Sequence, residues 1–207
     1  MLNSEFASIY SVRKSKSEAY RIFTHYVSNT NYCATIQNKI YKLTKTLKKL
    51  FFYWVTSFIL GTIIYYILWI ILPHHNVFGS LYRMFLYHWS HPISFIAIPC
   101  FFYGIMATLF ADKYLNQTLT KQILLTILII FLTILLSSPF GGMLWHYYDM
   151  KAGYFPPNWI SKMIKLGFEW GLGIGWLVIL LSIPYNIIGS IICYFLTKKG
   201  SELFRKE

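Results

Sequence analysis

The sequence predicts an all-α integral membrane protein with four transmembrane helices and a basic amphipathic helix before the first of them. Hydrophobic residues make up 56% of the chain and charged residues only 13%, whereas soluble domains average about 45–50% and about 25%. The apolar residues are gathered into four long runs without Asp, Glu, Lys, Arg or His. The nineteen Lys and Arg residues lie outside these runs and give the chain a net charge of +12.

Residues 36–50 form the predicted amphipathic helix, at the end of a basic N-terminal segment that covers residues 1–50. The apolar residues recur every three or four positions and so share one helical face. They are Ile36, Ile40, Leu43, Leu47 and Leu50. The lysines between them are Lys39, Lys42, Lys45, Lys48 and Lys49. We expect these lysines to reach acidic lipid headgroups, and the alternative is a coiled-coil seam with a partner, because the spacing also fits a heptad.

Four runs of about 20 residues are each long enough to cross the hydrocarbon core of a bilayer. They cover residues 51–72, 93–111, 123–145 and 171–197, which together define a membrane domain of residues 51–197. Pro99 and Pro184 lie inside the second and fourth runs. Prolines are tolerated in membrane helices when neighbouring groups satisfy the freed carbonyl, so we expect kinks at these positions.

The distribution of positive charge predicts that both termini face the cytoplasm. If they do, fifteen Lys and Arg residues lie on the inner side and four on the outer side, as the positive-inside rule requires. Residues 198–207 are then a basic cytoplasmic tail. A composition rich in Ile, Lys, Tyr and Phe indicates a bacterial source and therefore the bacterial cytoplasmic membrane.

Three histidines at the outer side are candidate ligands for a divalent metal such as zinc. His88 and His91 lie in the first outer loop, and His146 lies at the end of the third span. Imidazole and carboxylate groups are usual zinc donors, and Asp149 and Glu169 lie in the second outer loop. The alternatives are a pH-responsive role and ordinary interfacial residues. No other cofactor is expected.

Small residues near the fourth span predict close helix packing. Gly167, Gly171 and Gly175 repeat every four residues, and Asn186 lies further along the fourth span on the same helical face. Such residues let a neighbouring helix approach, while an amide can hydrogen-bond across the contact. The alternative is that Asn186 lines a polar path. We also expect a short helix at the outer surface, because Asn158 is a plausible N-cap before an amphipathic stretch.

The sequence favours a non-catalytic protein that acts by contact with lipid or with another membrane protein, as a regulatory, accessory or immunity-type component or as a homo-oligomer. No ionisable residue lies in the apolar runs, which argues against proton coupling. No nucleophile or phosphate-binding motif is present, and nucleic acid is not an expected partner. Two alternatives are an enzyme with its site at the outer rim and a facilitator of a small amphipathic molecule.

Overall fold

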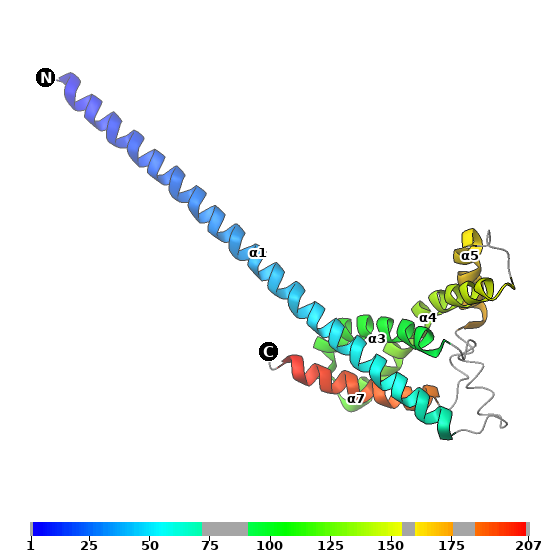
Figure 1. The fold of residues 1–207 in the computed structure, drawn as a ribbon. Coiled ribbons are helices and arrows are strands. Elements are labelled where there is room, and N and C mark those ends of the chain that lie inside the picture. The colour runs from blue at the N-terminus through cyan, green and yellow to red at the C-terminus, as the bar shows by residue number, and fades with distance from the viewer. Residues whose placement is uncertain (1, 72–90, 155–159, 176–184, 206–207) are drawn as a thin grey trace. The chain divides into compact units, whose positions relative to one another are not determined.

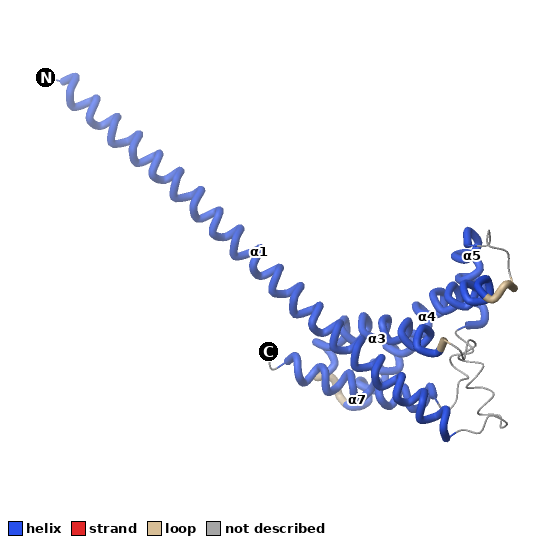
Figure 2. Tube along the Cα trace, viewed as in Figure 1, coloured by secondary structure: helices blue, strands red, loops and turns tan. Residues whose placement is uncertain are grey.

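The computed structural model describes residues 2–71, 91–154, 160–175 and 185–205. Over these residues the chain is helical apart from short connections, and no strand occurs among them (Figure 2). The prediction of an all-α chain is therefore confirmed for the described residues. Contacts divide the chain into two units, Met1–Leu47 and Lys48–Glu207. Unit 1 is part of a single helix, whereas unit 2 holds the packed helices.

Helix α1 covers Leu2–Ile71 without interruption. The sequence predicted an amphipathic helix at residues 36–50 that runs into the first span, and the structure places this segment and residues 51–71 in one helix. The reason lies in the composition, because neither Gly nor Pro occurs between Ile36 and Leu60, and sharp helix kinks are almost always caused by such residues or by inserted groups.

Three helices are long and apolar enough to cross a membrane, judged by their length and composition. They are Ile36–Ile71 within α1, α3 at Pro92–Tyr114, and α4 at Leu119–Lys151. Each contains one of the first three predicted spans, except that the predicted first span ends one residue beyond α1. Pro99 and Pro139 lie inside α3 and α4, so neither proline ends its helix.

The fourth predicted span, residues 171–197, is not one regular helix in the structure. Helix α5 covers Ile160–Trp170, where the sequence predicted a short surface helix, and runs directly into a π-helical turn, η2, at Gly171–Gly175. Helix α7 then covers Tyr185–Arg205. The intervening residues 176–184 lie outside the described part of the chain. Three glycines in five residues explain the irregular turn, because glycine gives a helix little conformational restraint.

In unit 2, α4 packs on α3 and α7 and, along its C-terminal half, on α5 and η2, while α3 also packs on α7 (Figure 1). Gly104 of α3 lies against Trp54 of α1, where an added Cβ would come within 3.0 Å of the Trp54 Cβ. Glycine therefore permits α1 and α3 to approach closely at this level. The main hydrophobic cluster lies beside this contact and contains Tyr53, Tyr103, Met106, Ala107, Ala111, Ile129 and Leu196.

One end of unit 2 carries most of its positive charge, and we call it the basic end. Contacts between Lys49 and Asp112, and between Tyr53 and Ser201, bring the first residues of unit 2 together with the C-terminal parts of α3 and α7. The short turn after Tyr114 places the beginning of α4 at the same end. The basic residues in these parts are Lys48, Lys49, Lys113, Lys121, Lys198, Lys199 and Arg205.

Candidate functional site

The buried pair His146 and Asp149 lies where α5 packs on α4. The two residues are three positions apart on α4, so their side chains share one helical face, and they are 5% and 7% exposed. The His146 ring stands edge-on to Trp170, with ring centroids 6.0 Å apart. His146 also interacts with the backbone of Leu166. These contacts join α4 to α5.

His91 lies on the other side of α4 from His146. Its ring stacks on Tyr148 with centroids 4.0 Å apart and an angle of 10° between the planes. The Tyr148 hydroxyl also lies 3.1 Å from the Ser94 Oγ of α3. Because residues two positions apart on an α-helix point about 200° apart, Tyr148 and His146 face in nearly opposite directions. The structure therefore does not bring His91 and His146 to one site.

The described residues do not assemble the predicted metal site. They contain no group of three or more His, Cys, Asp or Glu side chains able to hold a metal ion. Glu169, one of the acidic candidates, pairs with Lys165 at 3.8 Å on the exposed side of α5. His88 lies outside the described residues, so its contribution stays a prediction.

Two of the predicted packing glycines lie against α4. An added Cβ at Gly167 would overlap Met143, and one at Gly171 would overlap the Ser138 carbonyl and Pro139. Gly142 of α4 faces them in turn, because a Cβ there would come within 2.5 Å of the Gly167 carbonyl oxygen. Gly175 ends η2. Asn186 lies on α7, where it lines a cavity between four helices.

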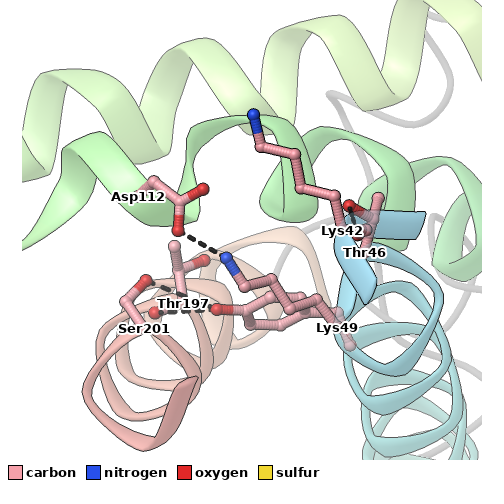
Figure 3. A network of polar contacts seen from close by, with 7 residues as sticks. Lys42, Thr46, Lys49, Asp112, Thr197 and Ser201 are labelled. Atoms are coloured by element: carbon pink, nitrogen blue, oxygen red, sulfur yellow. Dashed lines mark hydrogen bonds and ion pairs between the residues drawn. The ribbon is translucent and has the colours of Figure 1, made fainter. Parts of the chain in front are cut away.

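The basic end contains an ion pair that joins α1 to α3. The Lys49 ammonium contacts the Asp112 carboxylate, and Figure 3 shows the two side chains pointing toward each other. The Lys49 side chain is only 7% exposed, whereas that of Asp112 is 80% exposed. A buried ammonium needs a counter-charge and hydrogen bonds to offset its lost hydration, and Asp112 supplies both from the solvent side.

Two tyrosines extend this polar contact into the helix bundle. The Tyr53 hydroxyl lies 3.3 Å from the Ser201 Oγ and donates to the Thr197 carbonyl at 3.4 Å. The Tyr103 hydroxyl lies 2.8 Å from the Thr197 Oγ1 and donates to the Cys193 carbonyl at 3.2 Å. The result is a hydrogen-bonded contact among α1, α3 and α7. It contains hydroxyls and carbonyls, which is typical of a structural contact between helices.

The five lysines of residues 36–50 have two different environments. Lys39, Lys42 and Lys48 are exposed and Lys45 is half-buried. Lys49 departs from the expectation that it faces lipid headgroups, because its ammonium is buried against Asp112. The apolar face predicted for this segment is open, with Ile40 59%, Leu43 61% and Leu47 54% exposed.

Sequence reasoning missed Asp112, Tyr53 and Thr133, the last of which lines the cavity between the helices. One signal was available for Asp112, because it is the first carboxylate after Glu18 and directly follows a predicted span. Tyr53 and Thr133 gave no such signal, since tyrosine and threonine are ordinary in apolar runs.

Comparisons with protein-family models, curated proteins and solved structures found no match to this chain.

Proposed function

We propose that this chain is a non-catalytic, multi-pass protein of the bacterial cytoplasmic membrane that acts by contact, with its segment 36–50 bound to an anionic lipid surface. Contact with another membrane protein, in a regulatory or accessory role, belongs to the same proposal. The fourth crossing is formed by residues 171–197, and both termini face the cytoplasm. The single observation that carries the proposal is the open apolar face of residues 36–50 beside exposed lysines.

Charge favours lipid as the partner of this segment. No Asp or Glu occurs between Glu18 and Asp112, so the segment has no carboxylate of its own to neutralise its lysines. Each lysine near an anionic membrane surface contributes about 1 kcal/mol of attraction. Apolar side chains on the neighbouring face add hydrophobic binding once the helix bends ahead of the apolar run and lays segment 36–50 along the interface. An acidic lipid surface therefore complements both features at once.

A second copy of the chain is a less suitable partner. If the apolar residues of this segment occupy the a and d positions of a heptad, the e and g positions beside them hold Gln37, Lys39, Thr44 and Thr46. Paired coiled coils gain specificity from opposite charges at these positions, and none is available here. Two copies would also bring lysines together without any acidic neighbour.

The basic end of unit 2 supports the proposed topology. Seven Lys and Arg residues lie at this end. At the other end, the described residues include three basic ones, Lys151 on the final turn of α4 and Lys162 and Lys165 on α5. The positive-inside rule assigns the end with more positive charge to the cytoplasm. That assignment also gives the lysines of residues 36–50 access to the acidic inner leaflet.

A fluorophore on the apolar face tests lipid contact. Leu43→Cys carries an environment-sensitive nitrobenzoxadiazole label, in a full-length chain whose native cysteines are replaced by serine. We expect brighter, blue-shifted emission in nanodiscs that contain phosphatidylglycerol than in nanodiscs of phosphatidylcholine alone. High salt should reverse the change, because it screens exposed charges.

Two matched variants make this experiment decisive. A label at Asn38, on the opposite helical face, should respond little to lipid charge. Replacing Lys39, Lys42, Lys45 and Lys48 by Gln should abolish the response at position 43. Emission that is identical in both lipids contradicts the proposal, and a change that depends on protein concentration assigns the face to a second copy instead.

A further inference from the structure

A cavity of about 260 Å³ lies between helices α1, α3, α4 and α7 of unit 2. Its walls come from the apolar runs of the sequence, and no charged side chain is among its lining residues. Protein interiors are normally packed with few voids larger than a water molecule. This space is only partly enclosed, so a molecule from outside the helices can enter it.

Gly189 of α7 helps to create this space. The glycines 104, 142, 167, 171 and 200 all lie so close to another helix that an added Cβ would meet it. Gly189 differs from them, because an added Cβ there would have no heavy atom within 4 Å. It lines the cavity. The absence of a side chain at Gly189 is therefore not needed for close helix packing, and it enlarges the cavity.

Thr133 of α4 places a hydroxyl without a protein partner in the cavity wall. The residue is 7% exposed, and its Oγ1 has no hydrogen-bond partner among the residues that the structure describes. The other hydroxyls in the wall behave differently. Ser190 donates to the Asn186 carbonyl at 2.7 Å, and Ser57 donates to the Trp54 carbonyl at 2.9 Å. Leaving a buried hydroxyl unsatisfied is costly, so the position fits a hydroxyl that makes its hydrogen bond with the oxygen of a molecule from outside the chain.

The wall chemistry defines the class of ligand. A charged molecule is excluded, because no counter-charge lines the cavity and an unpaired buried charge is strongly unfavourable. The volume sets the size, since an apolar cavity of about 150 Å³ binds benzene, and by proportion 260 Å³ accepts about ten carbon atoms. We propose that this cavity binds a neutral, lipid-phase molecule whose apolar body of about this size carries one carbonyl or hydroxyl oxygen, hydrogen-bonded to the Thr133 hydroxyl.

Binding of 1-naphthol to the full-length chain in nanodiscs tests the proposal, with naphthalene as the probe that lacks the oxygen. Radiolabelled probe is measured after subtraction of protein-free nanodiscs. We expect saturable binding of about one 1-naphthol per chain, with weaker binding of naphthalene. Thr133→Val should weaken 1-naphthol binding about three- to tenfold, as loss of one hydrogen bond predicts, and should leave naphthalene binding unchanged.

Gly189→Leu fills the cavity and should abolish binding of both probes. Gly141→Leu is its matched control, because a Cβ at Gly141 also meets nothing within 4 Å but the residue does not line the cavity. Thermal unfolding checks that both variants fold, and Gly189→Val replaces Gly189→Leu if the larger side chain prevents folding. Equal binding to wild type and a folded Gly189 variant overturns the proposal. If Thr133→Val weakens the binding of 1-naphthol and naphthalene equally, the Thr133 hydroxyl does not hydrogen-bond to the ligand.

Discussion

The ion pair of Lys49 and Asp112 is asymmetric, and its two partners should respond differently to mutation. The lysine is buried while the carboxylate is exposed. Removing the carboxylate leaves a buried ammonium without its counter-charge, whereas removing the ammonium leaves a carboxylate that water can solvate. Breaking a pair by deleting one partner is most harmful when the remaining charge is buried.

Asp112→Asn should therefore destabilise the protein by about 1.5–3 kcal/mol, the range for a hydrogen bond to a charged group. Lys49→Met keeps the length of the side chain without its charge and should change stability by less than Asp112→Asn. Denaturant-induced unfolding in mild detergent measures both. Glu202→Gln is the control, because it breaks a pair with Lys199 that is exposed on both sides, and such pairs contribute about 0–1 kcal/mol.

Equal losses for Asp112→Asn and Glu202→Gln would show that Lys49 does not need Asp112. A loss in Lys49→Met larger than that in Asp112→Asn would also contradict the asymmetry, because it would assign the stabilisation to the lysine side chain itself.

The hydroxyls of Thr126 and Thr133 lie on the same helix but have opposite surroundings. The Thr126 Oγ1 lies 2.8 Å from the Tyr114 hydroxyl and donates to the Gln122 carbonyl at 2.9 Å. Thr126→Val should lower the free energy of unfolding by about 0.5–1.5 kcal/mol, because it removes these hydrogen bonds.

Thr133→Val should leave the stability of the ligand-free protein unchanged or raised, because it removes a buried hydroxyl that has no partner in the described chain. Thermal unfolding of the two variants, measured side by side, checks this, and a larger loss for Thr133→Val would contradict the description of the cavity wall.

At the scale of elements, the contact between α4 and the α5–η2 segment depends on glycine. Gly171→Leu should disrupt it, because the new side chain would overlap the Ser138 carbonyl and Pro139. Overpacking of this kind costs about 1–3 kcal/mol. Gly173→Leu is the matched control, since a Cβ at Gly173 meets nothing within 4 Å. Faster hydrogen exchange in α5 is expected for Gly171→Leu alone.

Equal exchange in both variants would mean that the close approach at Gly171 does not hold α5 in place. Slower exchange in Gly171→Leu than in the wild type would contradict the packing described for this segment.

The sequence predicted the helices better than their ends and contacts. Long apolar runs without charge make the positions of α3 and α4 predictable, because a membrane helix must satisfy its own backbone polar groups. The continuity of α1 across residues 36–71 was predictable, because the amphipathic pattern leads directly into the apolar run and neither Gly nor Pro occurs between Ile36 and Leu60. The irregular turn at Gly171 was less predictable, since glycine spacing indicates close packing and not the local helix type.

The candidate sites were harder to predict, because they depend on which helix faces which. The sequence predicted His146 at the end of the third span and Asp149 in the loop after it, whereas both lie on α4 and share a face. It also could not show that His91 stacks on Tyr148. The cavity was even less accessible to prediction. Its signals are the missing side chain of Gly189 and the open hydroxyl of Thr133, and both residues look ordinary in an apolar helix.

At the scale of the whole molecule, the proposed function requires a helix bundle that crosses the bilayer with its basic end toward the cytoplasm. Single cysteines at Asn38, Tyr154 and Lys199, in a cysteine-free chain, sample both proposed sides. The side chains of Tyr154 and Lys199 are exposed, so access to a reagent depends on the membrane and not on packing.

Labelling of intact cells with a membrane-impermeant maleimide is the most direct test of this central claim. The account predicts that the cysteine at position 154 reacts from outside, while those at positions 38 and 199 react only after the membrane is permeabilised. If positions 38 and 199 react from opposite sides, the chain crosses the membrane an odd number of times between them, and the four-span topology is wrong.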